Sequence, residues 1–422
     1  MVRLLSFGLV WLAASVMDAA PGYQEVNSAF GSAILADEKL WDDDPDSVAR
    51  RLGLPVESRT ATSSSYRLYT SADKKVLGTH PYSIALMAME GRVAQLSFVF
   101  TNSGDFGNVS DLKDSLETAV GKQRTDLNKK LREAVAAFPA AFRSDVTTLS
   151  GELTKLFGEP TSGRDGASRS TVEKLQRWSW SGHTIQLATK DNQYVALRIL
   201  PETDAAGSKP LRDSEVKARL RNSLERRSNG DVVITGIPMV DQGPKGFCVA
   251  ATLDRTLKFF GIPADMYALA VAGDTGMGGG ASPSKMMDAT ADLARSFGCR
   301  FEKAGSSVKI QSVSRYLDEG LPLIWSMNVV PVLHKNLSDR TRQRSQTSDV
   351  KAWKTVLKGW RKMIGRVKPE PGSGHVCMII GYNKETDELA ISDSWGPEYA
   401  ERWITVEEAE MISQNRLHTL RW

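Results

Sequence analysis

The sequence predicts an α+β protein in which helices pack on antiparallel sheets, and three observations lead to this expectation. Runs with alternating apolar residues occur twice in the N-terminal half, each after a short helix-like segment. The C-terminal half places a segment with helical periodicity directly after a Gly/Pro turn. It also contains apolar runs joined by a short polar turn, which is typical of paired antiparallel strands. Because the chain has 422 residues, we expect two or three domains.

The composition, with 41% hydrophobic and 25% charged residues, is ordinary for a soluble globular protein. The formal net charge of +4 is small for this length, so we expect no nucleic-acid partner. Three cysteines are too few for a disulfide scaffold. Cys299 and Cys377 could pair, but two separate buried thiols are the expected state.

The histidines outside the candidate site show no metal-ligand spacing with Cys, Asp or Glu, so no metal or other cofactor is predicted. These residues are His80, His183, His334 and His418. We expect them to be structural or to lie on the surface, and only His334 is placed where it could approach the cleft.

The first twenty residues resemble a signal peptide, with an uncertain cleavage site. Arg3 precedes an apolar run over residues 4–16, which is too short to span a bilayer comfortably. We therefore expect a secreted or periplasmic protein without a transmembrane segment. The alternative is an apolar first helix in a cytosolic protein.

Residues 22–205 are predicted to form an N-terminal α+β region with a degenerate internal repeat. The copies, at residues 46–100 and 152–200, each combine a short helix that ends at Gly-x-Pro with three alternating strands. Between them, apolar residues at four- and seven-residue steps predict one long helix over residues 110–137 that packs on the sheets. The copies could form one continuous platform or two lobes.

Two basic segments follow. Residues 208–230 are expected to be a basic helical linker with a solvated face, which could instead bind a membrane or an acidic partner, or act as a propeptide hinge. Residues 333–370 hold eleven Lys/Arg against three acids and read as a basic insertion. Helical spacing over residues 350–364 predicts a buried Trp stripe and an exposed basic face. The alternative is a cap over the cleft that recruits acidic peptide or anionic polymer, with Arg361, Lys362 and Arg366 lowering the KM.

Cys248 is predicted to begin a helix, after a strand at residues 232–234 and a Gly/Pro turn. The positive end of a helix favours thiolate over thiol. Gln242, six residues upstream, has an amide N–H that could point at an oxyanion beside the sulfur. This stretch is therefore the place for a nucleophile.

His375 is predicted to lie at the mouth of a second strand, and Asp393 follows the next strand, Glu388 to Ser392. If these neighbouring strands are antiparallel, the two side chains come close together. One ring nitrogen can then face Cys248 while the other donates to Asp393, which is the nucleophile, base and orienter arrangement of thiol catalysis.

Together, the Gln-(five residues)-Cys spacing, the Gly-His pair and the Asp-Ser-Trp-Gly segment resemble the papain-like cysteine peptidases. The Asp in the third position and the Gly-Tyr-Asn after the histidine strand are more similar to the bacteriocin-processing (double-glycine leader) peptidase branch. The resemblance covers residues 231–422. The sequence has no Cys-Gly-Ser-Cys-Trp box and no fused transporter, so leader-peptide export is not implied.

The resemblance implies a papain-like fold in which a helix carrying the cysteine packs on an antiparallel sheet. It also implies that Cys248 is the nucleophile, His375 the general base, Asp393 the orienter and Gln242 the oxyanion-hole donor. Trp395 would then shield the His–Asp pair from water.

A glycine-rich loop after the cysteine helix supplies candidate substrate-binding residues. Gly278, Gly279 and Gly280, together with Trp395, are expected to meet the substrate, because glycines allow an extended peptide to approach the backbone. A flexible turn before a helix at residues 284–297 is the alternative.

These observations predict a secreted papain-like cysteine peptidase that hydrolyses peptide bonds through a Cys-His-Asp triad with a Gln oxyanion hole. The expected partner is a peptide or protein substrate. A transglutaminase-like acyl transferase would use the same residues, and a catalytically silent protease-like binding module is the third alternative. The sequence does not specify the substrate, zymogen control or the oligomeric state.

Overall fold

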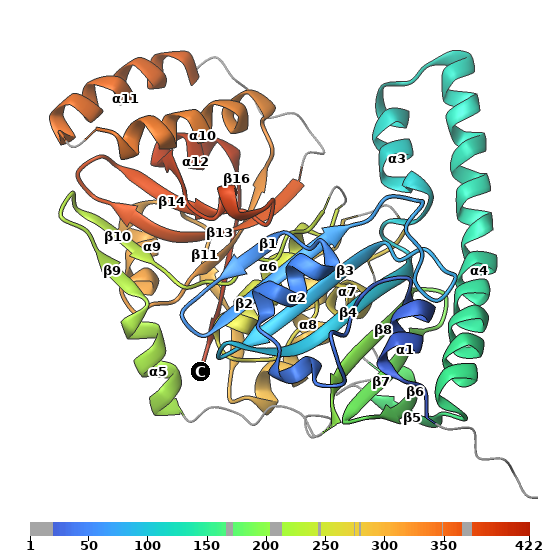
Figure 1. Cartoon of the computed structure of the whole chain (residues 1–422). Helices are drawn as coiled ribbons and strands as arrows, with labels where there is room; N and C mark the ends of the chain where they lie inside the picture. The colour runs from blue at the N-terminus through green and yellow to red at the C-terminus, as the bar shows by residue number, and fades with distance from the viewer. Residues whose placement is uncertain are drawn as a thin grey trace, which may run out of the picture.

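The computed structural model describes residues 20–165, 172–202, 213–243, 246–273, 275–277, 280–347, 349–364 and 374–422. In these ranges the chain forms two eight-stranded antiparallel sheets with helices packed against them, so the α+β class is confirmed (Figure 1). The N-terminal half forms one sheet and the C-terminal half forms the other. Among these residues no helix has the length and apolar character needed to cross a bilayer.

The N-terminal sheet has the strand order β1-β2-β3-β4-β8-β7-β6-β5. The strands are β1 (Val56–Arg59), β2 (Ser63–Tyr69), β3 (Ser83–Met89), β4 (Arg92–Asn102), β5 (Thr161–Asp165), β6 (Glu173–Trp180), β7 (His183–Lys190) and β8 (Tyr194–Pro201). Each half of the sheet is a four-strand meander, and the halves meet where β4 pairs with β8. The two copies therefore form one continuous platform.

Each copy has four strands rather than the predicted three. The additional strands, β1 and β5, follow the Gly-x-Pro segments directly and form the two outer edges of the sheet. They are short, and neither Val-Glu-Ser-Arg nor Thr-Ser-Gly-Arg-Asp alternates between apolar and polar residues. Edge strands of this kind give no periodic signal in a sequence.

The N-terminal sheet is buried on both faces. Phe98 of β4 and Leu197 of β8 pack with the helices of the N-terminal half. Their neighbours Val99 and Ala196 point the other way and belong to the core of the C-terminal half. Because successive side chains of a strand point to opposite faces, each central strand serves two cores. The C-terminal half is thus packed directly onto the platform.

Helices α1 (Tyr23–Phe30), α2 (Pro45–Leu52) and part of α4 (Gly121–Phe157) cover the outer face of the platform. The predicted single helix over residues 110–137 is wrong. The chain instead forms a helical hairpin from α3 (Val109–Thr118) and α4, seen at the right of Figure 1. The reversal falls at Val120, which is 76% exposed, and at Gly121, whose φ of 56° favours glycine. The apolar periodicity continues through this turn, so the sequence pattern conceals it.

The predicted linker over residues 208–230 is only partly helical. Helix α5 (Asp213–Asn222) is followed by β9 (Leu224–Arg226), which pairs with β10 (Asp231–Ile234) in the C-terminal sheet. Val216 and Leu220 are buried in the C-terminal core. This segment is therefore built into the C-terminal unit.

The C-terminal sheet has the order β11-β16-β12-β13-β10-β9, with β14 and β15 continuing from β13. Its remaining strands are β11 (Arg300–Gly305), β12 (Leu323–Asn328), β13 (Gly374–Asn383), β14 (Glu388–Ser392), β15 (Arg402–Thr405) and β16 (Ser413–Arg421). Its helices are α6 (Cys248–Phe259), α7 (Met266–Ala272), α8 (Pro283–Ser296), α9 (Ile310–Leu317), α10 (Pro331–Ser345), α11 (Val350–Ile364) and α12 (Val406–Ile412). Helix α6 packs against β13. Strand β12 lies in the middle of the sheet, as its apolar sequence predicts.

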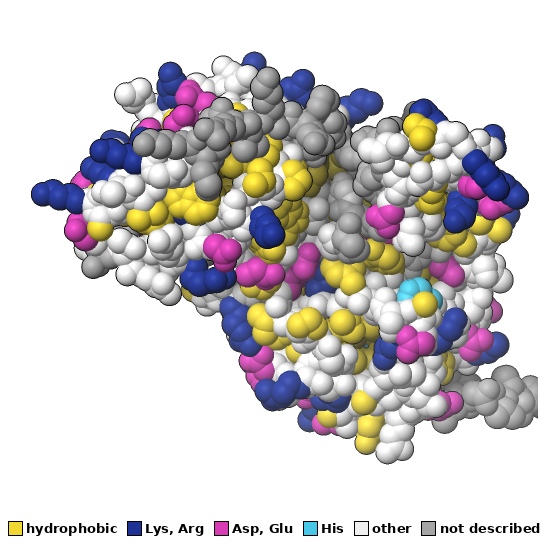
Figure 2. All heavy atoms as spheres, turned by 90° about the horizontal axis from the view of Figure 1, so that it is seen from above, with side chains coloured by type: hydrophobic (Ala, Val, Ile, Leu, Met, Phe, Trp, Pro, Cys, Tyr) yellow, Lys and Arg dark blue, Asp and Glu magenta, His cyan; other side chains and the backbone are white. Residues whose placement is uncertain are grey.

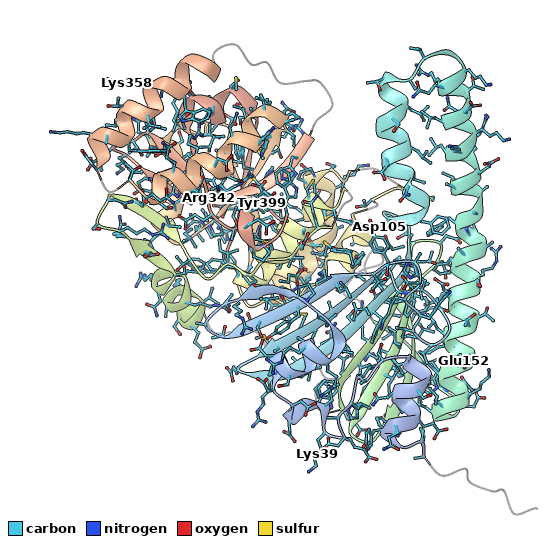
Figure 3. The ribbon with its side chains drawn as sticks, turned by 45° about the horizontal axis from the view of Figure 1, so that its top comes forward. Lys39, Asp105, Glu152, Arg342, Lys358 and Tyr399 are labelled. Atoms are coloured by element: carbon cyan, nitrogen blue, oxygen red, sulfur yellow. The ribbon has the colours of Figure 1, made fainter. Side chains whose placement is uncertain are left out.

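The basic insertion forms α10 and α11, on the side of the C-terminal unit away from the helical hairpin (Figure 3). Trp353 and Leu357 of α11 are buried and Lys358 is exposed, as the helical spacing predicts, whereas Trp360 of the predicted stripe is only half-buried. Two arginines of α10 are not solvated as predicted, since Arg340 is buried and Arg344 is half-buried. Arg340 makes a bidentate contact with Glu408, and Arg344 pairs with Asp231 and Glu388. Two of the eleven basic residues of the insertion therefore fasten it to the domain.

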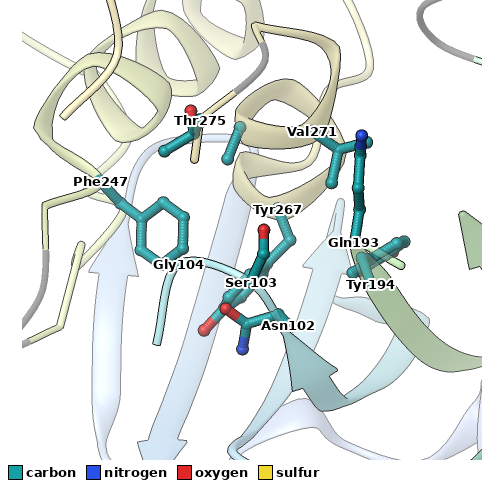
Figure 4. A pocket seen from close by; sticks show the side chains of 10 residues that line it. Asn102, Ser103, Gly104, Gln193, Tyr194, Phe247, Tyr267, Val271 and Thr275 are labelled. Atoms are coloured by element: carbon teal, nitrogen blue, oxygen red, sulfur yellow. The ribbon is translucent and has the colours of Figure 1, made fainter. Parts of the chain in front are cut away.

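The three cysteines are separate buried thiols. Near one of them, the phenyl ring of Phe247 lies against the backbone of Gly104, where a side chain on residue 104 would collide with the ring. Figure 4 shows the small pocket at this junction, between the end of β4 and helix α7. The residue before Cys248 is thus seated on the N-terminal platform.

Candidate active site

Cys248 is the first residue of α6, at the end of the helix where the backbone N–H groups are unpaired. The side chain is 9% exposed, so the sulfur lies at a nearly closed surface. The residues of the turn just before it, Pro244 and Lys245, lie outside the described residues. The predicted position of the cysteine at a helix N-terminus is what the structure has.

His375 and Asp393 are in contact, as the strand pattern predicts. Strands β13 and β14 are antiparallel neighbours, and Asp393 directly follows β14. The His375 ring is bonded through Nε2 to Asp393 Oδ1 at 2.8 Å. This leaves Nδ1 for the Cys248 thiol, which is the hydrogen-bonding neighbour of the ring. His375 and Asp393 are both buried, at 5% and 0% exposed.

The electrostatics favour an ion pair between sulfur and ring. Burial acts to raise the pKa of Cys248, but the hydrogen bond and charge of His375 outweigh it, and the pKa falls below its ordinary value. Burial acts to lower the pKa of His375, but its bonds to Asp393 and Cys248 raise the pKa to about 9. Opposite shifts in a contacting pair are the condition for a thiolate beside an imidazolium.

Trp395 covers this pair. Its indole stacks on the His375 ring, with ring centroids 4.6 Å apart and an interplanar angle of 28°. The Tyr399 ring meets the indole edge-on, with ring centroids 5.6 Å apart. A stacked indole excludes water from the ring and so preserves the strength of its ionic contacts. The expected shielding geometry is therefore present.

Arg402 is a residue of the site that sequence reasoning missed. It lies on β15, is 1% exposed, and donates from Nη2 to Asp393 Oδ2, while Asp393 Oδ1 accepts from His375. Burial acts to raise the pKa of Asp393, but His375 and Arg402 hold it well below its ordinary value. A buried arginine needs a charged partner. An arginine in the apolar sequence of β15 was therefore the signal by which the sequence could have indicated Arg402.

His334 of α10 also reaches the site, as the sequence position allowed. Its Nδ1 lies 3.3 Å from Arg402 Nη2, and its ring meets Trp395 at a centroid distance of 5.2 Å. Burial, together with the charges of Arg402 and His375, lowers the pKa of His334 to about 4 despite the opposing effect of Asp393. The ring is therefore neutral at neutral pH and accepts a hydrogen bond from Arg402.

The other predicted site residues are Gln242 and the three glycines of the glycine-rich loop. Gln242 is buried, and its backbone N–H donates to the carbonyl of Ser394 at 2.8 Å. Ser394 directly follows Asp393 in the chain. Gly278 and Gly279 lie outside the described residues. Gly280 is exposed, and a Cβ there would meet nothing within 4 Å, so sterics do not require glycine at this position.

One further contact links the surroundings of the site to the N-terminal half. Lys113 of α3 donates to the carbonyl of Met277, which joins the helical hairpin to the glycine-rich loop. In Figure 2 the hairpin and the helices of the C-terminal unit stand on opposite sides of a notch. No group of three or more His, Cys, Asp or Glu among the described residues has a geometry that could hold a metal ion.

Sequence comparison agrees with this geometry. Residues 234–417 match the Peptidase_C39 like family. The match includes Gln242, Cys248, His375, Asp393 and Arg402. No curated protein matches the chain. The resemblance drawn from the motifs is confirmed for the C-terminal unit, which is consistent with the papain-like cysteine peptidase superfamily. The match supports a peptidase, an activity whose substrates are peptides or proteins.

Proposed function

We propose that the protein is a papain-like cysteine peptidase that hydrolyses peptide bonds with Cys248 as nucleophile. The observation that carries the proposal is the buried contact between Cys248, His375 and Asp393, in which the pKa of the thiol falls and the pKa of the imidazole rises. The position of α6 on the antiparallel sheet supports a papain-like arrangement.

In the proposed reaction the Cys248 thiolate attacks the carbonyl carbon of the scissile amide. The backbone N–H of Cys248 and the amide of Gln242 stabilise the oxyanion. The His375 imidazolium gives its proton to the leaving amine as the C–N bond breaks. His375 then takes a proton from water, which attacks the thioester and releases the acid. Asp393 holds the ring with Nδ1 toward the sulfur throughout.

The test is the rate of Cys248 alkylation by iodoacetamide against pH, in the wild type and in His375→Ala, with peptide mapping to separate Cys248 from Cys299 and Cys377. A rate plateau well below the free-thiol pKa of about 8.5, lost in the variant, supports the proposal. A rate that rises only near the free-thiol pKa and ignores the mutation refutes it. That result would favour a silent binding module.

Acyl transfer to an amine is the second candidate, because a thioester accepts an amine as readily in principle as water. Incubation of a peptide pool with and without a primary amine distinguishes the two. Free carboxylates alone indicate hydrolysis, and amine adducts that depend on Cys248 indicate transfer.

We also propose export, on the basis of Arg3 and the apolar run at residues 4–16. N-terminal sequencing of the mature protein tests it. A new N-terminus between residues 15 and 22 is expected, whereas a retained apolar run would contradict export through a cleaved signal.

A further inference from the structure

The stretch that carries Gln242, residues 239–243, has no strand partner in the C-terminal sheet. Its main-chain groups must therefore be satisfied in another way if the stretch is to hold one conformation. On the side of the C-terminal unit, Gln242 N–H donates to the carbonyl of Ser394, and the buried Arg255 donates from Nε to the carbonyl of Pro238, the residue just before the stretch, at 2.9 Å. These contacts fix only part of the stretch.

The N-terminal platform supplies three further contacts. The Ser58 hydroxyl accepts from Met239 N–H at 2.9 Å, and Glu57 Oε1 accepts from Asp241 N–H at 2.8 Å. The hydroxyl of Tyr69 donates to the carbonyl of Asp241 at 2.6 Å. Three side chains of β1 and β2 thus hold three main-chain groups of Met239 and Asp241, just before Gln242.

Local backbone geometry explains how two neighbouring residues of β1 can do this. In a regular strand Glu57 and Ser58 would face opposite sides of the sheet. The pairing of β1 with β2 slips between Val56 and Ser58, which is a β-bulge, and both Glu57 and Ser58 are buried. Bulges re-aim side chains and often lie next to active sites. Strand β1, which the sequence did not predict, therefore directs two side chains at the main chain before Gln242.

The contacts around Asp241 and Gly243 leave the main chain little freedom to move. Glu57 is itself fixed, because Oε1 accepts from Arg67 Nε at 2.6 Å and Oε2 from the Ser65 hydroxyl at 2.9 Å. Gly243 has a φ of 70°, and a Cβ there would lie 2.6 Å from the Tyr69 ring. Glycine is therefore required both by the backbone angle and by the closeness of the tyrosine.

We propose that Tyr69, Ser58 and Glu57 are positioning residues for the oxyanion hole, so that the N-terminal platform is a working part of the peptidase. This inference rests on the proposed function and adds a role for the platform. Tyr69 and Ser58 hold the main chain at Met239 and Asp241 so that the Gln242 amide is set before the oxyanion forms. Preorganised donors of this kind lose their effect when they are displaced by small distances.

Two probes of Cys248 separate this role from general stability. Acylation by p-nitrophenyl acetate forms an S–C bond, passes through an oxyanion, and expels p-nitrophenolate. Alkylation by iodoacetamide forms an S–C bond and expels iodide without an oxyanion. The ratio of the two rates, with Cys248→Ala as the blank, therefore reports oxyanion stabilisation.

We expect Tyr69→Phe and Ser58→Ala each to lower the acylation rate by about tenfold while alkylation stays within about twofold. The matched control is Ser83→Ala, because Ser83 bonds the Tyr267 hydroxyl across the same interface, away from residues 239–243. It should change neither rate. In a Gln242→Ala background, Tyr69→Phe should not lower the acylation rate further, because both substitutions act through the Gln242 amide.

Unchanged acylation in folded Tyr69→Phe and Ser58→Ala would overturn the inference. So would a parallel loss of both rates, or a full additional loss in the Gln242→Ala background. Circular dichroism and thermal melting verify folding. If wild-type Cys248 shows no thiolate plateau, the proposed function fails as well. A normal plateau with an unchanged rate ratio refutes the positioning role alone.

Discussion

Arg402 and His375 bind opposite oxygens of the same carboxylate, that of Asp393. A buried carboxylate with two cationic neighbours stays ionised far into the acidic range, and the pKa of Asp393 accordingly lies well below its ordinary value. Asp393, which orients His375 in the proposed triad, is thus held in place by Arg402. Arg402 also stacks over the Tyr399 ring, so its guanidinium is held from more than one side.

Replacing this arginine should therefore affect the site mainly at low pH. In Arg402→Lys the pKa of Asp393 rises, because an ammonium does not reproduce the planar contact. We expect alkylation of Cys248 at pH 4 to fall by about tenfold, with a much smaller change at pH 8. Tyr399→Phe keeps the ring under Arg402 and serves as the control. An equal loss at both pH values would contradict the assigned role.

The ring of His375 should titrate near pH 9 in the wild type. Its pKa is raised to about 9, so the ring is protonated below this pH and neutral above it. In Asp393→Asn the anionic partner is lost, and the titration should move down toward the ordinary value of about 6.5. NMR of the ring resonances, assigned with His375→Ala, measures this. A ring that titrates at the same pH in both proteins would show that Asp393 does not stabilise the imidazolium.

We expect Trp395 to increase the reactivity of Cys248 by excluding water from the His375–Asp393 pair. In Trp395→Ala the His375–Asp393 pair is hydrated and its attraction weakens. We expect alkylation of Cys248 at pH 6 to fall by about tenfold, while Trp395→Phe, which retains a stacked ring, stays within about threefold. Equal rates in the Ala and Phe variants would indicate that stacking has no part in the reactivity.

The central elements of the C-terminal unit were predictable because their signals are local. Cys248 follows a turn and opens a helical pattern, and His375 and Asp393 mark two neighbouring strands joined by a short turn. Strand β14 has the predicted bounds. Local propensity and periodicity suffice for such segments.

The contacts that hold the site were not predictable, because they depend on the packing of distant segments. Arg402 and His334 are 68 residues apart in the chain, and no motif joins them. Ser58 lies 181 residues before Met239, and its strand has a bulge in place of alternation. The turn at Gly121 is hidden because an apolar pattern continues through it. Each of these features is defined by its tertiary partner.

The buried charges of the basic insertion lead to a final prediction, about stability. Arg340 and Glu408 are each 2% exposed and make two hydrogen bonds of 2.6 Å. Removing one member of such a pair leaves the other buried without its counter-charge. We expect Arg340→Met to lower the free energy of unfolding by about 3–5 kcal/mol, measured by urea denaturation.

The matched control lies two residues further along the same helix. Arg342 pairs with Asp339 at 3.2 Å, but the side chains are 70% and 69% exposed. Water screens that pair, so Arg342→Met should change the free energy of unfolding by less than about 0.5 kcal/mol. Similar effects of the two substitutions would mean that the insertion is not fastened by its buried arginine. A large effect of Arg340→Met alone would show that α10 owes part of its basic composition to structure.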